Sequence, residues 1–314
     1  MANNVGPDAG GNRSSRPVTS ERHVNGRRPG TMKRSFEITT SQGPVSGIFG
    51  RAAESAGKQP TLLVAIHGGT YSSRYFDIPG HSLIDRAMAA GFDIIAPDRP
   101  GYGGSEPLAD GPEMLDRNAA RLADLMGEIT GALELQPEGI ALIGHSMGGV
   151  IAASIAARRP DWPLRGIMVT GFAQTLPAHL AEDFAKLPPG YFVEMPTALK
   201  DQVMFGPPDT LPETMPAASH PANTLMPRAE AIDIAGDWGH RAPGLLGRVT
   251  VPVYYKLAQH EQLWHIADQA TVAAMLTRAP KIETGIFAGA GHCIDFHKRS
   301  ADFHDEMLRF AAAL

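Results

Sequence analysis

The sequence predicts an α/β fold in which a mostly parallel, doubly wound sheet carries helices on both faces. Two observations lead to this prediction. Short apolar runs rich in β-branched residues recur along the chain, and segments with apolar residues at helical spacing separate them. Strands that are covered on both faces read as continuous apolar runs, and repeated alternation of strand and helix is typical of a parallel sheet.

The expected elements occupy residues 35–314. An initial pair of strands, 35–40 and 44–50, is joined by the turn signal Gly43-Pro44. The later strands are expected at residues 61–66, 92–97, 139–144, 166–171, 251–257 and 281–287. The helices are expected at residues 81–90, 114–133, 150–159, 264–278 and 300–313. This order places helices on both sides of one sheet.

Residues 172–248 break this alternation. The segment holds eleven of the 26 prolines together with scattered methionine and aromatic residues. Irregular segments of this length inside a compact domain are usually functional, for example as active-site lids. We therefore expect a cap insertion of short helices and turns over the active-site edge of the sheet. The candidates for substrate contact are Phe192, Met204, Phe205 and Trp238.

Residues 1–34 differ in composition from the rest of the chain. They carry seven Lys and Arg against two acidic residues, are rich in Gly, Ser, Pro and Asn, and almost lack large apolar side chains. Such a segment cannot offset the entropy lost on ordering, so we expect a disordered basic tail. An Arg- and Ser-rich transit peptide is the alternative interpretation, and the lack of an amphipathic face argues against it.

Charge and hydropathy exclude several classes of partner. The net charge of −5 gives no electrostatic footprint for nucleic acid. No stretch approaches the ~18 unbroken apolar residues of a membrane helix, and no apolar run follows the basic tail as a secretory signal requires. The single cysteine, Cys293, excludes an internal disulfide and a Cys-based metal cluster. We expect a cytoplasmic protein that uses no metal and no cofactor.

The strongest functional signal is GHSMGG at 144–149, where an expected strand passes into an expected helix. A serine on so tight a turn is held in a strained backbone conformation that exposes its hydroxyl. The close approach of strand and helix favours glycine two residues before and two after the serine. Gly144 and Gly148 occupy those positions. We therefore predict that Ser146 is a catalytic nucleophile.

A second signal, HGGT at 67–70, directly follows the strand expected at 61–66. The oxyanion that develops during acyl transfer needs two preorganised donors, and backbone N–H groups serve well because they need no reorganisation. We expect one donor from Met147. The other is expected from the region of Gly69 and Thr70, where missing side chains let the backbone approach the substrate.

The general base is expected at His292, in the segment GAGHC at 289–293 after the last strand. A serine hydroxyl is too weak an acid to attack unaided at neutral pH, so an imidazole must accept its proton. A histidine on a loop of small residues at the carboxyl end of a strand is well placed to reach the nucleophile. His145 adjoins the serine in sequence, but we expect it to point away from the serine on the turn.

The third catalytic residue is expected at Glu261. In chain order the acid should lie between the serine and the histidine, on a loop that follows a strand. Glu261 is the only carboxylate in the segment 258–262, directly after the strand at 251–257. Asp268, in the next expected helix, is the alternative. The acid would hold one tautomer of the imidazole and stabilise the imidazolium.

Two further features have structural interpretations. The segment DRPGYGGS at 98–105 follows the strand expected at 92–97, and its glycines could suggest a phosphate-binding loop. It lacks the Lys-Ser/Thr ending of such a loop, so we interpret it as a structural turn. Cys293, beside His292, is interpreted as a buried thiol.

Together these motifs resemble the α/β-hydrolase superfamily over about residues 35–314. The resemblance rests on HGG at 67–69, DRPGYGGS at 98–105, GHSMGG at 144–149 and GAGH at 289–292. It implies the α/β-hydrolase fold, a Ser-His-acid triad, two backbone oxyanion donors and a variable cap. Glu261 departs from the pattern because Asp is commoner at the acid position, which keeps the assignment of the acid open. Serine at the elbow, in place of Asp, argues against epoxide and haloalkane chemistry.

Three functions are consistent with these residues. The first is hydrolysis of a carboxylic ester or related acyl bond in a medium-sized, mainly apolar small-molecule acyl substrate, through an acyl-enzyme. The second keeps the acyl-enzyme but changes the acceptor, as in a thioesterase, cyclase or acyltransferase of a biosynthetic pathway. The third is a hydrolase-shaped binding protein without turnover, and an intact triad argues against it.

Overall fold

The computed structural model describes residues 32–53, 57 and 59–314. Residues 1–31, which make up most of the expected basic tail, lie outside the described residues. Strand β1 begins at Met32, three residues before the first strand expected from the sequence. In the part of the chain that is described, no helix is long and apolar enough to cross a lipid bilayer.

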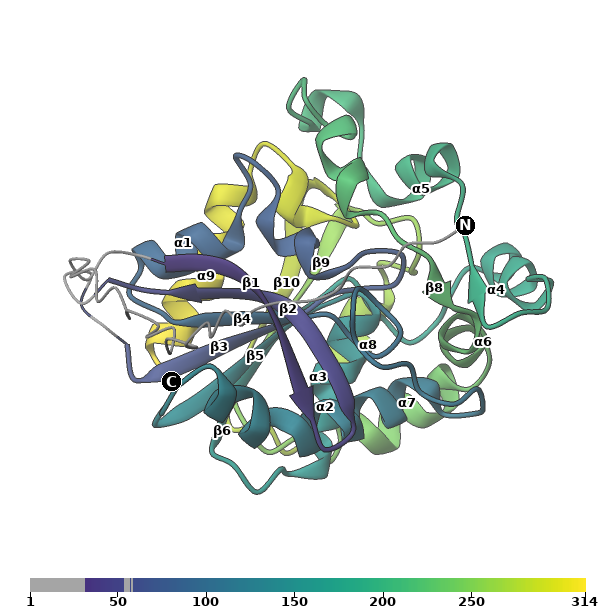
Figure 1. Cartoon of the computed structure of the whole chain (residues 1–314). Coiled ribbons are helices and arrows are strands. Elements are labelled where there is room, and N and C mark those ends of the chain that lie inside the picture. Colours follow the sequence, from purple (N-terminus) through teal and green to yellow (C-terminus); the bar gives the residue numbers. More distant parts are fainter. Residues whose placement is uncertain (1–31, 54–56, 58) are drawn as a thin grey trace, which may run out of the picture.

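Eight strands form one sheet in the order β1-β2-β4-β3-β5-β6-β9-β10 (Figure 1). In sequence order, β1 to β6, β9 and β10 span Met32–Thr40, Gly43–Arg51, Thr61–Ile66, Ile94–Pro97, Gly139–His145, Leu164–Thr170, Val253–His260 and Ile282–Gly291. Strand β2 is antiparallel to both of its neighbours, and the other pairs are parallel. The predicted α/β fold with a mostly parallel sheet is confirmed.

Helices cover both faces of the sheet (Figure 1). On one face α1 (Leu83–Ala89) contacts α9 (Ser300–Ala312), and on the other α2 (Met114–Ala132) contacts α3 (Met147–Arg158). Helix α8 (Asp268–Met275) packs on β9 and β10. Every residue of β3 and of β5 is buried, which explains why both strands read as unbroken apolar runs.

Short helices and turns fill the segment between β6 and β9, as its many prolines predict. The helices are α4 (Ala178–Ala185), α5 (Thr197–Met204), α6 (Arg228–Gly236) and α7 (Trp238–Leu246), with 3-10 turns at Pro208–Thr210 and Ala217–Ala222. Two short strands, β7 (Phe192–Val193) and β8 (Met226–Pro227), pair with each other in a separate antiparallel sheet. We call residues 172–248 the cap segment. Its green ribbon gathers at one end of the sheet (Figure 1).

The cap segment contacts loops at the carboxyl ends of the strands. Glu230, in α6, forms an ion pair with Arg99, which follows β4. The carbonyl oxygen of Met204, at the end of α5, accepts a hydrogen bond of 3.0 Å from the N–H of Cys293, which follows β10. The carboxyl ends of parallel strands meet at one edge of a sheet, so the cap segment lies over the edge that carries the sequence motifs.

Candidate active site

Ser146 occupies the tight turn between β5 and α3. Its backbone has φ 57° and ψ −125°, a strained region for a residue that carries a side chain. A Cβ atom on Gly144 would lie 2.5 Å from the carbonyl oxygen of Gly148, and one on Gly148 would lie 2.0 Å from the carbonyl oxygen of Ile66. Both positions therefore require glycine, and this close packing of strand and helix holds the serine at the edge of the sheet.

His292 directly follows β10, and Glu261 directly follows β9. Nδ1 of His292 lies 2.9 Å from Oε1 and 2.9 Å from Oε2 of Glu261, and both side chains are fully buried. Because a carboxylate only accepts hydrogen bonds, neutral His292 carries its proton on Nδ1 and leaves Nε2 as an acceptor. Asp268, the alternative acid, accepts a hydrogen bond of 3.0 Å from the N–H of Thr175 instead.

The imidazole of His292 lies beside the turn that holds Ser146. A Cβ atom built on Gly171 would be 3.1 Å from Cε1 of His292 and 3.3 Å from the backbone nitrogen of Ser146. Nε2 of His292 is buried and has no hydrogen-bond partner among the described residues. The structure thus brings together Ser146, His292 and Glu261, which directly follow the parallel strands β5, β10 and β9.

His145 supports the main chain of His292. Nε2 of His145 lies 3.1 Å from the carbonyl oxygen of His292, and the His145 ring stacks on Tyr75 with 4.5 Å between ring centroids. Burial lowers the pKa of His145 to about 3, so the ring is neutral and donates to that carbonyl through Nε2. His145 therefore helps to place His292.

Residues 67–70, which we call the oxyanion segment, pack against the turn of Ser146. A Cβ atom on Gly68 would lie 2.9 Å from Cβ of Ser146, and one on Gly69 would lie 2.9 Å from Sδ of Met147. Only glycine allows the backbone to approach the serine so closely. Met147 begins α3, so its N–H has no partner within the helix. The expected donor positions thus lie next to Ser146.

Thr70 ends the oxyanion segment in a left-handed conformation. Its φ is 61°, which is unusual for a β-branched residue. The Thr70 carbonyl oxygen accepts hydrogen bonds of 2.6 Å from Nζ of Lys200 and 3.0 Å from the N–H of Thr224. Burial lowers the pKa of Lys200 to about 7. Two residues of the cap segment therefore hold the strained Thr70 in place.

An apolar pocket adjoins Ser146. It is lined by Gly69, Thr70, Ser146, Met147, Leu176, Phe184, Met195, Met204, Met226, Ile234, Leu263 and Trp264. Eight of these residues belong to the cap segment or to the loop after β9 and carry large apolar side chains. Ser146 and Thr70 supply the hydroxyl groups. This lining suits a substrate with an apolar portion next to the bond that reacts.

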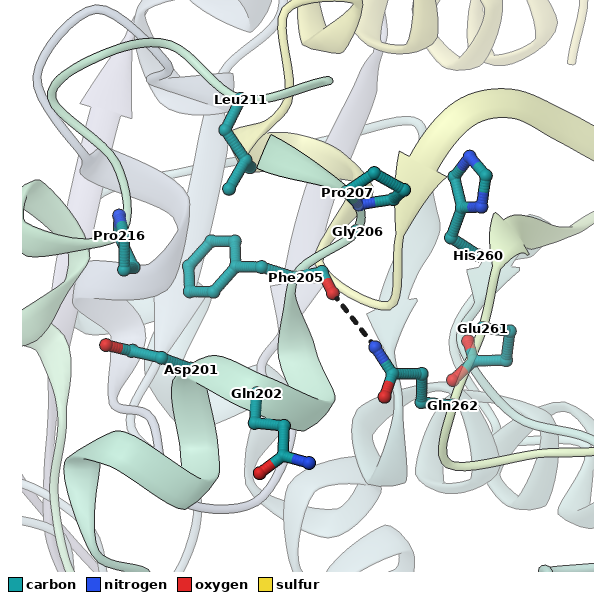
Figure 2. A pocket seen from close by; sticks show the side chains of 10 residues that line it. All are labelled: Asp201, Gln202, Phe205, Gly206, Pro207, Leu211, Pro216, His260, Glu261 and Gln262. Carbon is teal, nitrogen blue, oxygen red and sulfur yellow. Dashed lines mark hydrogen bonds between the residues drawn. The ribbon is translucent and has the colours of Figure 1, made fainter. Parts of the chain in front are cut away.

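A second, more open pocket adjoins Glu261 (Figure 2). Its lining residues are Asp201, Gln202, Phe205, Gly206, Pro207, Leu211, Pro216, His260, Glu261 and Gln262. Nε2 of Gln262 donates a hydrogen bond of 3.2 Å to the carbonyl oxygen of Phe205, which links the loop after β9 to the cap segment (Figure 2). Ser146 lines the apolar pocket, so that pocket is the candidate substrate site.

The four cap residues expected to contact substrate lie in different places. Met204 lines the apolar pocket, and Phe205 lines the second pocket. Phe192 is 43% exposed on the surface. Trp238 is buried, and its Nε1 donates to the main chain just after β6. Of the four, Met204 is the one that shares a pocket with Ser146.

The segment 98–105 and Cys293, which we interpret as structural, have the following surroundings. Asp98 accepts a hydrogen bond of 2.6 Å from Oγ of Ser46, and Oγ of Ser105 donates to the carbonyl oxygen of Asp98. Cys293 is buried, and burial raises the pKa of its thiol. Across residues 32–53, 57 and 59–314, no group of three or more His, Cys, Asp or Glu side chains is arranged to hold a metal ion.

Comparison of the sequence with known protein families gives a match to the model described as Alpha/beta hydrolase family over residues 63–306. The chain belongs to this family. Lipase LipV of Mycobacterium tuberculosis is 35% identical over 103 residues, which cover 32% of this chain and 34% of LipV. The chain spans 34–38% of the length of the curated relatives that it matches.

Solved structures resemble this chain over most of its length. E-2-(acetamidomethylene)succinate hydrolase has a TM-score of 0.63 at 18% identity, covering 89% of this chain and 99% of that one. A thermophilic esterase from Thermogutta terrifontis has a TM-score of 0.58 at 17% identity, covering 88% and 98%. At these identities the likeness shows a shared α/β-hydrolase fold.

Two buried basic side chains contact the oxyanion segment, and neither is predicted from the sequence. Arg99 and Lys200 are 0% and 1% exposed. The glycines of DRPGYGGS indicate a turn but do not indicate that Arg99 is buried. The one signal for Arg99 is its position at the carboxyl end of an expected strand. Nothing in the sequence around Lys200 distinguishes it from an exposed lysine of a short helix.

Proposed function

We propose that this hydrolase cleaves a carboxylic ester-like bond of a small-molecule acyl substrate through an acyl-enzyme on Ser146. One observation carries the proposal: Nδ1 of His292 is paired with both carboxylate oxygens of Glu261, while Nε2 has no partner among the described residues and the ring lies, through Cε1, beside the turn of Ser146. A general base for serine needs this arrangement, because the acid fixes the tautomer that leaves Nε2 free to accept a proton.

Acylation follows from the positions of these groups. Oγ of Ser146 attacks the carbonyl carbon of the substrate, and Nε2 of His292 takes the hydroxyl proton. Glu261 stabilises the imidazolium that forms. The N–H groups of Met147 and Gly69 donate hydrogen bonds that stabilise the negative charge developing on the carbonyl oxygen. As the tetrahedral intermediate collapses, His292 returns the proton to the leaving alcohol.

Deacylation repeats the same steps with water as the nucleophile. His292 takes a proton from the water that attacks the acyl carbon, and the same oxyanion donors stabilise the second tetrahedral intermediate. His292 then protonates Oγ of Ser146 as the carboxylic acid leaves. Each proton transfer uses Nε2 alone, because Nδ1 stays paired with Glu261.

The apolar pocket supports a substrate with an apolar acyl or alcohol portion. Methionine, leucine, isoleucine, phenylalanine and tryptophan side chains form most of its wall. Burying apolar surface contributes roughly 25 cal/mol per Å², so each added methylene that enters the pocket strengthens binding. LipV is named a lipase and the Thermogutta terrifontis protein an esterase, which agrees with an ester substrate.

Labelling and turnover test the proposal together. A fluorophosphonate should modify the wild-type protein on the peptide that contains Ser146, and Ser146→Ala should not be modified. p-Nitrophenyl esters of graded chain length should be hydrolysed by the wild type. His292→Ala should lose about as much activity as Ser146→Ala, and the double variant should lose no more, because the triad acts as a unit. Folded wild-type protein that neither reacts with the probe nor hydrolyses any ester would contradict the proposal.

A thioester substrate separates hydrolysis from acyl transfer. With an amine or alcohol acceptor present, the proposed hydrolase should still release mainly the free acid. A predominant amide or ester product would instead assign the acyl-enzyme to a transferase.

A further inference from the structure

Arg99 follows β4, and its guanidinium is fully buried beside the oxyanion segment. Nε donates to the carbonyl oxygen of His67 at 2.8 Å, and Nη2 donates to that of Gly68 at 3.1 Å. On the cap side, Nη1 and Nη2 lie 2.5 and 3.0 Å from the two carboxylate oxygens of Glu230. One planar group thus joins two consecutive carbonyls of the oxyanion segment to helix α6.

The contact with Gly68 sets the direction of the next N–H group. In a trans peptide, the C=O of one residue and the N–H of the following residue point in opposite directions, and the peptide between Gly68 and Gly69 is trans. The Gly68 carbonyl is held by Arg99 and also by Nδ1 of His67, at 2.8 Å. The N–H of Gly69 therefore faces away from Arg99, and Gly69 itself lines the pocket of Ser146.

We propose that Arg99 is a positioning residue for the oxyanion hole, which locks the Gly68–Gly69 peptide so that the Gly69 N–H stays directed at the reacting carbonyl. Glu230 makes this arrangement depend on the cap segment, because without α6 the guanidinium would lose its counterion. The inference rests on the proposed function, since it concerns the donor that the proposed reaction uses.

A contribution to folding stability does not by itself explain why Arg99 and Glu230 form a buried ion pair. Desolvation of two buried ions offsets much of their attraction, and apolar replacements of similar volume are often as stable. The carboxylate of Glu230 is nevertheless fully satisfied, with further hydrogen bonds from the Tyr102 hydroxyl at 2.7 Å and Nδ2 of Asn118 at 3.3 Å. Because every partner in this network is satisfied, Arg99 is held in one orientation. A residue that positions the oxyanion segment needs such a fixed orientation.

Arg99→Lys tests the geometry while it keeps the charge. A single ammonium group cannot bind two carbonyls and a carboxylate in the planar fork of arginine. Loss of one aligned oxyanion donor should lower kcat for a p-nitrophenyl ester on the order of 100-fold, with little change in KM. Affinity for a boronic acid that forms a tetrahedral adduct on Ser146 should fall by a similar factor. Glu230→Gln should change both quantities in the same direction but less.

Arg241→Lys is the matched control. Arg241 also joins the cap segment to the core, where it bridges Asp116 of α2 and Asp233 of α6. Its contacts lie outside the oxyanion segment. We expect both Arg241→Lys and Arg99→Lys to lower the melting temperature, because each weakens a contact between the cap segment and the core. Arg241→Lys should keep kcat and boronate affinity near their wild-type values.

Two kinetic results would overturn the inference. The first is folded Arg99→Lys protein with wild-type kcat and boronate affinity. The second is an equal loss of kcat in Arg99→Lys and Arg241→Lys, which would assign the effect to docking of the cap segment alone. Failure of the proposed function looks different, because the wild type would then neither hydrolyse esters nor react at Ser146.

A crystal structure of Arg99→Lys decides the inference without any activity measurement. A rotated Gly68–Gly69 peptide together with an unchanged His292–Glu261 pair supports it. An unrotated peptide overturns it.

Discussion

Both carboxylate oxygens of Glu261 lie 2.9 Å from Nδ1 of His292. The two residues meet because β9 and β10 are adjacent parallel strands, and each residue directly follows the carboxyl end of its strand. Oε1 of Glu261 also accepts a hydrogen bond of 3.0 Å from the N–H of Leu263, which fixes the carboxylate against the imidazole. This relationship gives the first prediction.

Glu261→Gln should lower kcat by on the order of 10³-fold, because the amide removes the charge that stabilises the imidazolium and can present an N–H to Nδ1. Steady-state hydrolysis of a soluble p-nitrophenyl ester measures the change, and circular dichroism checks the fold. Asp268→Asn is the control, since Asp268 binds the N–H of Thr175, and it should keep wild-type kcat. If Asp268→Asn lost activity while Glu261→Gln kept the wild-type kcat, the acid of the triad would be Asp268 instead of Glu261.

Gly148→Ala should lower both stability and activity. The new Cβ would lie 2.0 Å from the carbonyl oxygen of Ile66 and 2.6 Å from that of His67, so the backbone of β3 or α3 must shift. We expect a loss of about 2–4 kcal/mol in the free energy of unfolding, together with reduced kcat as the oxyanion segment moves. Urea unfolding followed by tryptophan fluorescence measures the stability.

Gly127→Ala is the matched control for this substitution. Gly127 lies within α2, and no heavy atom would lie within 4 Å of a Cβ atom there. Alanine should raise the free energy of unfolding by about 0.5–1 kcal/mol, because it restricts the unfolded chain and fits the helix. Equal stability of the two variants would show that the turn of Ser146 tolerates a side chain at position 148.

The fold could be predicted because local physical constraints show directly in the sequence, and constraints of the same kind lead to the proposal of the three catalytic candidates. A strand buried on both faces needs an apolar residue at nearly every position, and β3 and β5 satisfy this throughout. The turn of Ser146 requires glycine at two fixed positions for steric reasons. Each such signal extends over only a few residues, so no distant contact is needed to recognise it.

The contacts between the cap segment and the core could not be predicted. Arg99 and Glu230 are 131 positions apart, and neither has a neighbour pattern that indicates burial. Prolines break the cap segment into short elements without a regular apolar period, so the direction of each side chain depends on individual turns. Met204 and Trp238 read alike as apolar anchors, yet Met204 lines the pocket of Ser146 and Trp238 is buried with a hydrogen bond to the main chain just after β6.

Lys200→Met should make stability less dependent on pH. Burial lowers the pKa of Lys200 to about 7, whereas an unfolded chain has a lysine pKa of about 10.4. Between these values the unfolded chain binds more protons than the folded one, so the contribution of Lys200 to the free energy of unfolding rises with pH. The slope is at most about 1.4 kcal/mol per pH unit. The penalty for burying the charged lysine is full below pH 7 and fades above it.

Urea unfolding at pH 7 and pH 9 measures this effect as the difference in stability between wild type and Lys200→Met. Relative to Lys200→Met, the wild type should have a larger free energy of unfolding at pH 9 than at pH 7. Lys186→Met is the control, because the Lys186 side chain is 72% exposed and stays in water when the chain folds. A wild-type advantage that stays constant with pH would mean that Lys200 remains charged in the folded protein up to pH 9.

Met195→Trp should shift the substrate preference toward shorter acyl chains. Met195 lines the apolar pocket together with Ser146, and a larger side chain would occupy space that a long chain needs. We expect kcat/KM for an octanoate ester to fall roughly tenfold relative to the acetate ester, the scale on which apolar pockets discriminate chain length. Leu199→Trp, on the exposed side of α5, is the control and should leave the profile unchanged, since Leu199 is 47% exposed. An unchanged profile in Met195→Trp, with Ser146 still reactive, would place the acyl chain outside this pocket and direct attention to the open pocket beside Glu261 (Figure 2).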